Sequence, residues 1–142
     1  MSVCTFFGHS SCPESIREKL RESMVDLIEN KGVTLFYVGH QGEFDRMVLS
    51  VLRELKSEYG IDYAIVLAYL PEKRGSADTR DLSDTLFPEG IEKVPKRFAI
   101  TWRNRWMLQR SDYVITYVRH SWGGAAQFAE LAQRQKKTVL AL

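Results

Sequence analysis

Residues 33–70 read VTLFYVGHQGEFDRMVLSVLRELKSEYGIDYAIVLAYL, and this stretch decides the fold class. It begins with an uninterrupted apolar run over 33–38, which predicts a buried strand that ends at Gly39. The following apolar residues recur at helical spacing and form one stripe, made of Phe44, Met47, Val48, Val51, Leu52 and Leu55. Gly60 ends this helix, and a further strand is expected over 61–70. The stretch therefore predicts a strand–helix–strand unit with parallel strands.

The same alternation continues outward in both directions along the chain. The other expected elements are strands over 3–7, 113–118 and 138–142 and helices over 13–32, 95–111 and 125–135. In the third helix, Phe98, Trp102 and Trp106 recur every four residues and predict an aromatic core stripe. Alternating strands and helices predict an α/β fold, a Rossmann-like three-layer sandwich with a mostly parallel sheet of about five strands. No boundary or repeat interrupts the pattern, so we expect a single domain over 1–142.

The stretch 72–94 does not fit this alternation, because it is polar and rich in Gly, Asp and Arg. A connection of this length inside a compact domain is usually a functional lid or conceals a short element.

Composition excludes several classes of protein. The 142 residues carry a net charge of +2, which is too small to predict nucleic-acid binding by a bulk field. No apolar run has membrane-spanning length, and the first residues carry no basic leader, so we expect neither a membrane partner nor a signal peptide. The two cysteines, Cys4 and Cys12, are expected to be free thiols in a reducing compartment, which favours a cytoplasmic protein.

Candidate site residues follow the predicted strands, because ligands of open parallel sheets bind beyond the carboxyl ends of the strands. The first strand ends at Gly8 and His9. The turn after the second strand holds Gly39, Gln41, Gly42 and Asp45. Glycines between a strand and a helix let the backbone approach an anion, although tight packing explains such a pair equally well.

The turn after the strand at 113–118 is a stronger candidate for a phosphate site. It holds Ser121, Gly123, Gly124, Ala125 and Gln127, and it leads directly into a helix. The helix dipole and the unpaired N–H groups there favour negative charge, whereas the alternative is a tight turn that needs positive φ. The preceding helix carries several arginines, of which Arg103, beside Asn104, is the candidate to clamp a phosphate. The others are expected to form a solvated basic face.

Each of the three histidines directly follows a predicted strand, so His9, His40 and His120 should lie at the same edge of the sheet. This makes a metal site or an acid–base pair conceivable. No carboxylate or cysteine cluster completes a set of ligands, so we expect no metal and no cofactor.

Five motifs follow one another along the chain: Gly8-His9, Gly39 to Asp45, Arg103-Asn104 with Met107, Ser111-Asp112, and Gly123-Gly124. This ordered set resembles the SLOG superfamily, which includes the LOG phosphoribohydrolases, DprA and the YpsA-like proteins. The set spans nearly the whole chain and is most similar to the uncharacterised YpsA-like branch. The resemblance implies a Rossmann-like domain that binds nucleotides or nucleotide-derived ligands.

The LOG branch cleaves the base from nucleoside monophosphates with an arginine and a glutamate, and Arg103 and Glu130 match these two residues by their spacing. A glutamate there assists departure of the base or activates water, while the arginine holds phosphate. The glycine loop departs from the LOG pattern, because Trp122, Ala126 and Gln127 replace its proline, third glycine and threonine. The resemblance therefore supports binding better than catalysis.

Three hypotheses follow, and they leave open whether the protein is an enzyme. The first is binding, sensing or processing of a nucleotide-derived small molecule at the carboxyl edge of the sheet. The second is a phosphoribohydrolase or N-glycosidase that uses Arg103 and Glu130. The third and weakest is a DprA-like nucleic-acid module, since this charge balance makes nucleic acid an unlikely partner. The aromatic surplus around Trp102 and Trp106 also favours a homodimer.

Overall fold

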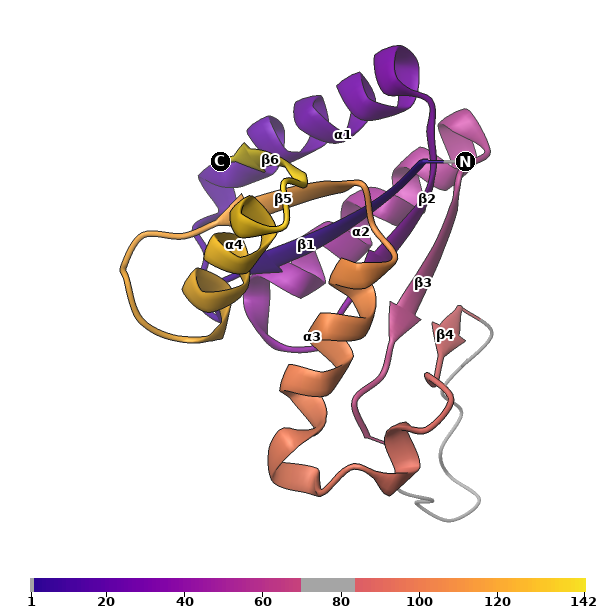
Figure 1. The fold of residues 1–142 in the computed structure, drawn as a ribbon. Coiled ribbons are helices and arrows are strands. Elements are labelled where there is room, and N and C mark those ends of the chain that lie inside the picture. Colours follow the sequence, from indigo (N-terminus) through magenta and orange to yellow (C-terminus); the bar gives the residue numbers. More distant parts are fainter. Residues whose placement is uncertain (1, 70–83) are drawn as a thin grey trace.

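The computed structural model describes residues 2–69 and 84–142, and its centre is a sheet of six strands in the order β4-β3-β2-β1-β5-β6 (Figure 1). The strands are β1 (Ser2–Gly8), β2 (Val33–Val38), β3 (Asp62–Val66), β4 (Thr85–Leu86), β5 (Tyr113–Tyr117) and β6 (Thr138–Ala141). All neighbouring strands pair in parallel. The predicted α/β class and parallel sheet are confirmed, with one strand more than expected.

Helices cover both faces of this sheet and complete the three layers (Figure 1). They are α1 (Arg17–Lys31), α2 (Gly42–Tyr59), α3 (Ala99–Gln109) and α4 (Gly124–Arg134), with 3₁₀ segments at Glu14–Ile16, Ile91–Lys93 and Lys96–Phe98. The core under α1 and α2 includes Phe6 and Phe36, and the core under α3 and α4 includes Phe7 and Val114. Among the described helices, none combines the length and the apolar character that a membrane span requires.

The direction of the chain across the sheet reverses at β1. From β1 the strands proceed outward through β2, β3 and β4, and the chain then returns to place β5 and β6 on the other side. Gly8 at the end of β1 is in register with Tyr117 at the end of β5. The turns that leave these two strands therefore diverge from one point, which is where open parallel sheets bind ligands.

Helix α2 forms where the apolar stripe predicted it. All six stripe residues are buried against the sheet, where they exclude water from the larger core. Gly60 follows the last helical residue with φ of +70°, and its N–H donates to the carbonyl of Lys56. This left-handed end is the C-cap that the sequence predicted.

The third strand is shorter than the expected 61–70, because β3 ends at Val66. The carbonyl of Val66 accepts a hydrogen bond from Arg103 of α3, and the N–H of Leu67 donates to the carbonyl of Leu86 in β4. The stretch 72–94 does conceal a short element, since β4 pairs with β3 through Thr85 and Leu86. Residues 72–83 of the expected lid lie outside the described part of the chain.

The aromatic core stripe expected on the third helix is wrong for Phe98, and only Trp106 of the three rings is recorded as packing against the core under α3 and α4 among the described residues. Helix α3 buries Ala99, Arg103, Met107 and Leu108, whereas Phe98 is 51% exposed. Trp106 is partly buried, with an edge-on contact to Tyr37 and the Arg110 guanidinium over its ring. The periodicity of the large aromatic rings was therefore one residue out of phase with the face that meets the sheet.

Candidate functional site

A cavity of about 420 Å³ lies at the divergence point, beyond the ends of β1 and β2 and between α3 and α4. Ten of the residues predicted for the site line it: Gly8, His9, Gly39, Gln41, Asp45, Arg103, Asn104, Gly123, Gly124 and Ala125. Its apolar lining comes from Phe6, Phe7, Ile100 and Met107. This volume is within the usual range for small-molecule sites, and the mixture of apolar walls with a few polar groups is typical of them.

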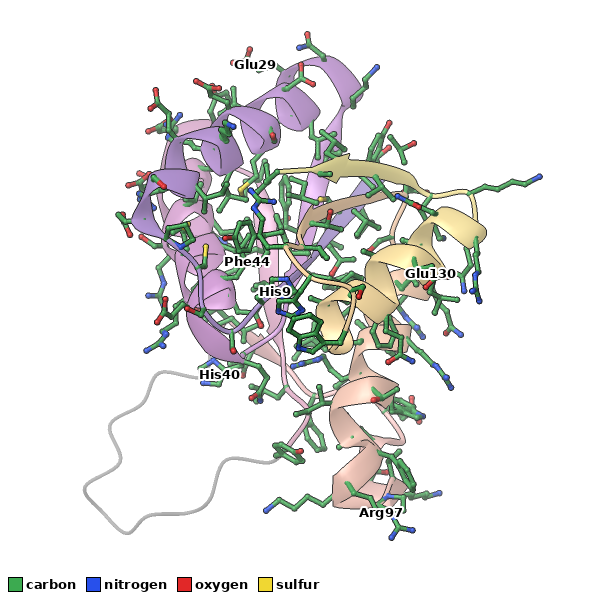
Figure 2. All side chains as sticks on the ribbon, turned by 90° about the vertical axis from the view of Figure 1, so that its left-hand side faces the viewer. His9, Glu29, His40, Phe44, Arg97 and Glu130 are labelled. Carbon is green, nitrogen blue, oxygen red and sulfur yellow. The ribbon has the colours of Figure 1, made fainter. Side chains whose placement is uncertain are left out.

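Four predicted site residues do not line this cavity. Gly42 lines a smaller neighbouring cavity of about 220 Å³, and Ser121 and Gln127 are exposed beside the opening turn of α4. The side chain of Glu130 is 63% exposed and forms an ion pair with Arg134 one turn along the same helix. Figure 2 shows Glu130 on α4, well away from His9.

Arg103 is a buried cation in the cavity wall, with only 2% of its surface exposed. Its Nε donates to the side-chain oxygen of Asn104 at 2.9 Å, and its Nη1 donates to the carbonyl of Val66 at 3.0 Å. Burial lowers the pKa of the guanidinium, and the negative charge of Asp45 acts in the opposite direction. The group nevertheless keeps its charge at neutral pH, because an arginine pKa begins above 12.

Asp45 approaches Arg103 across Gly39. A Cβ atom at Gly39 would meet Asp45 Oδ2 at 2.9 Å and Arg103 Cζ at 3.0 Å, so glycine is the residue that leaves room for both groups. Burial raises the pKa of Asp45 to about 6, although the N–H of Gln41 and the charge of Arg103 both favour the carboxylate. The cavity therefore holds a cation beside a carboxyl group that titrates close to neutral pH.

The turn that leads into α2 is closed by the protein itself. The N–H of Gln41 donates to Asp45 Oδ2 at 2.9 Å, and the N–H of Glu43 donates to the carbonyl of Ser10 at 2.7 Å. Gly42 has φ of +87°, and a Cβ there would lie 2.5 Å from Ser10 Cα. Tight packing therefore accounts for this glycine, as the alternative interpretation of the sequence held.

The turn that leads into α4 is open by contrast. Among the residues that the structure describes, no side chain caps this helix, and a Cβ on Gly124 would meet no heavy atom within 4 Å. Gly123 has φ of +92°, so the turn itself requires glycine, while the space in front of Gly124 is not needed for packing. The first N–H groups of a helix have no acceptor within it, so this turn presents donors and a positive dipole end to the cavity.

A column of three aromatic rings forms another wall of the cavity. The rings of His9 and His120 stack with centroids 3.7 Å apart, and those of His120 and Trp122 stack at 3.9 Å. The main-chain N–H of Arg119 donates to His9 Nε2 at 2.8 Å, which puts the proton of neutral His9 on Nδ1. Burial lowers the pKa of His9, and the positive charges of His120 and Arg119 lower it further.

The three histidines follow the carboxyl ends of β1, β2 and β5 at one edge of the sheet, as expected. His9 and His120 stack on each other, whereas His40 is exposed and lines the smaller cavity, apart from His9 in Figure 2. His120 and Trp122 were absent from the predicted site residues. The sequence does hold a pattern that could have indicated them. Trp122 directly precedes the pair Gly123-Gly124, and His120, at the end of a strand, lies in the same turn. Among residues 2–69 and 84–142, no cluster of three or more His, Cys, Asp or Glu side chains has the arrangement of a metal site.

Comparison with known proteins identifies the fold. No protein-family model matches the chain, and no curated protein is similar to it at a significant level. The structure is similar to that of DNA processing protein A (DprA) from Streptococcus pneumoniae, with a TM-score of 0.68 and 14% sequence identity. The match covers 99% of this chain and 50% of DprA, so the chain spans about half the length of that protein. The two share a Rossmann-like α/β fold, while the SLOG superfamily and its YpsA-like branch stay predictions.

Proposed function

We propose that the 420 Å³ cavity binds a nucleotide or nucleotide-derived ligand, with a phosphate group of the ligand at the N-terminus of α4. The observation that carries this proposal is the open turn at Gly123 and Gly124, where no side chain of residues 2–69 or 84–142 caps the helix or packs in front of Gly124. A phosphate there accepts hydrogen bonds from the first N–H groups of the helix and lies at the positive end of its dipole.

The other groups around the cavity support an anionic ligand of this size. Arg103 supplies a permanent positive charge in a buried part of the cavity wall. Because little water reaches the guanidinium there, its attraction for an anion is only weakly screened. Two of the five N–H donors of its guanidinium are held by Asn104 and Val66, which fix the group in place before a ligand arrives. The α2 turn uses its N–H groups internally, so we assign it to holding Asp45 and Arg103 rather than to the phosphate.

The hydrolase hypothesis receives less support from the geometry. An acid that protonates a leaving base must be within hydrogen-bond reach of it, but Glu130 is exposed and paired with Arg134. Of the carboxylates among the described residues, it is Asp45, not Glu130, that lines the cavity. We therefore keep ligand binding as the proposal, and cleavage by Arg103 and Glu130 as its untested alternative.

A second candidate function is binding of single-stranded nucleic acid. It is favoured by the similarity to a DNA processing protein, together with Trp122, which is 69% exposed at the rim of the cavity. Aromatic rings of this kind stack unpaired bases. Such binding would weaken steeply with salt and would be lost on replacing Arg103 and Arg105, which a filter or anisotropy assay measures.

The experiment that tests the proposal is a thermal-shift screen with AMP, ADP-ribose, NAD and cyclic nucleotides. A ligand at about a hundred times its dissociation constant adds about 2.7 kcal/mol to stability, which for this size of protein is a shift of several degrees. The decisive variant is Gly124→Asp, because an acidic residue at a helix N-terminus is tolerated or stabilising but repels phosphate. Its matched control is Gly124→Asn, which has the same size without the charge.

We expect Gly124→Asp to fold and to lose the ligand shift, while Gly124→Asn keeps most of it. If the wild type responds to none of these compounds, the proposal is wrong. If both variants respond like the wild type, the phosphate does not bind at α4.

A further inference from the structure

Trp122 is the free end of the ring column, and this position is unusual for so large an apolar side chain. One face of its indole is covered by the ring of His120, with an interplanar angle of 18°. The side chain is nevertheless 69% exposed, the largest exposure among the bulky hydrophobic residues that the structure describes. The opposite face of the indole is therefore available to a planar group in solution.

The column is held in place from its other end. His9 accepts the main-chain N–H of Arg119 and contacts Tyr117 edge-on, with ring centroids 5.9 Å apart. His120 Nδ1 lies 2.9 Å from the carbonyl oxygen of Trp122, which links the middle ring to the backbone beside the last one. The indole is thus oriented before any ligand binds, so a ligand that stacks on it loses little free energy in ordering the side chain.

We propose that the outer face of Trp122 stacks the nucleobase of the bound ligand, and that it prefers purines to pyrimidines. This inference rests on the proposed function, because it assigns the base of the same ligand whose phosphate binds at α4. Trp122 directly precedes Gly123 and lines the same cavity, so the indole and the helix N-terminus border the one space that the ligand is proposed to occupy. A purine covers more of the two-ring indole than a pyrimidine does, and stacking attraction grows with the contact area.

A small planar ligand explains this ring better than a protein partner does. The residues beside Trp122 in the turn are Ser121, Gly123 and Gly124, which are all exposed and add no apolar surface. The other exposed bulky hydrophobic residues among those described, Tyr59 and Phe98, belong to the end of α2 and the segment before α3. A stable protein interface buries about 800 Å² on each partner, which one indole ring in a polar turn does not provide.

The test measures dissociation constants of AMP, CMP and ribose 5-phosphate by calorimetry. The proteins are the wild type, Trp122→Ala, Trp122→Tyr and Phe98→Ala, and the last removes an exposed aromatic ring outside the cavity as a matched control. Loss of one base–aromatic stack weakens binding by about tenfold or more. We therefore expect Trp122→Ala to weaken AMP about tenfold and CMP less, to leave ribose 5-phosphate unchanged, and to be partly rescued by Trp122→Tyr.

The outcomes separate this inference from the function on which it rests. If ribose 5-phosphate and AMP bind the wild type equally and Trp122→Ala changes neither, phosphate binding stands and base stacking is overturned. If no phosphate compound binds the wild type, both proposals fail. If a single-stranded oligonucleotide binds through Trp122 while AMP does not, the ring serves nucleic acid, and the mononucleotide inference is overturned.

Discussion

Arg103 of helix α3 donates a hydrogen bond of 3.0 Å to the carbonyl of Val66, the last residue of β3. This bond fixes a buried positive charge in the wall of the cavity. The same arginine faces Asp45 across Gly39, so one side chain links α3, β3 and the turn before α2. Arg103 therefore contributes both to the geometry of the site and to the stability of the fold, and a change of this residue should affect both.

We expect Arg103→Ala to destabilise the protein by about 2–4 kcal/mol, because it leaves buried polar partners without a donor and Asp45 without a nearby cation. Urea denaturation measures this change. Arg105→Ala is the matched control, since Arg105 lies two residues away on the same helix and is exposed. Its expected effect is within about 0.5 kcal/mol. Equal stabilities of the two variants would contradict the structural role of Arg103.

Gly8→Ala is expected to destabilise the protein by about 1–3 kcal/mol through overpacking. An added Cβ would lie 2.2 Å from the ring of Phe44, which is completely buried. Gly124→Ala is the control, because its Cβ meets no atom of the described part of the chain within 4 Å, and it should be neutral or slightly stabilising. In a double-mutant cycle with Phe44→Leu, the costs should be less than additive. Strict additivity would show that the two residues do not compete for space.

Asp45 should make stability fall as the pH rises. Its pKa is about 6 in the folded protein, against 3.8 for an ordinary aspartate, so the folded state binds the proton more tightly than the unfolded state does. The resulting contribution is complete below the unfolded pKa and is lost as the pH rises through about 6. Relative to Asp45→Asn, the wild type should lose roughly 1–3 kcal/mol across this window. Parallel pH profiles of the two proteins in chemical denaturation would refute the assignment.

His9 should affect the pH dependence of stability in the opposite direction, so that its contribution is lost as the pH falls. Its pKa lies below 6.5, so its contribution to stability is present above the unfolded pKa and is lost as the pH falls through the folded value. Protonation does not remove Nδ1–H but places a second proton on Nε2, which then no longer accepts the N–H of Arg119. NMR titration of the histidines should give this low pKa, and acidification should change the fluorescence of Trp122. A His9→Phe variant should abolish the fluorescence change, and a change that persists in it would exclude His9 as the cause.

Glu130→Gln should leave both stability and ligand affinity nearly unchanged. The glutamate is an exposed partner of Arg134 in a pair of the kind worth about 0.3–0.5 kcal/mol. The assay follows release of free base from nucleoside monophosphates together with a binding titration. Base release by the wild type that disappears in Glu130→Gln would instead favour the phosphoribohydrolase hypothesis and require Glu130 to approach the cavity when a ligand binds.

Much of the fold followed from local pattern. The stripe of α2 and its closing Gly60 appear in the structure where periodicity placed them, since an amphipathic helix needs no distant information to define its buried face. The aromatic stripe of α3 was misassigned, because Trp102 and Trp106 are as apolar as core residues but the sheet instead receives Arg103 and Met107. A buried arginine is rare enough that no periodicity rule predicts it.

The sequence by itself determined the alternation of strands and helices, and with it the edge of the sheet at which Gly8, Gly39 and Gly123 lie, because parallel strands all end at one edge. Only the tertiary structure decided which of these turns is closed and which is open. Ser10 and Asp45 accept hydrogen bonds from N–H groups of the α2 turn, while no described residue packs within 4 Å of the Cβ position of Gly124. It also stacked His9, His120 and Trp122, which are more than a hundred residues apart at the extremes. Such contacts depend on the order of strands in the sheet, which local sequence does not encode.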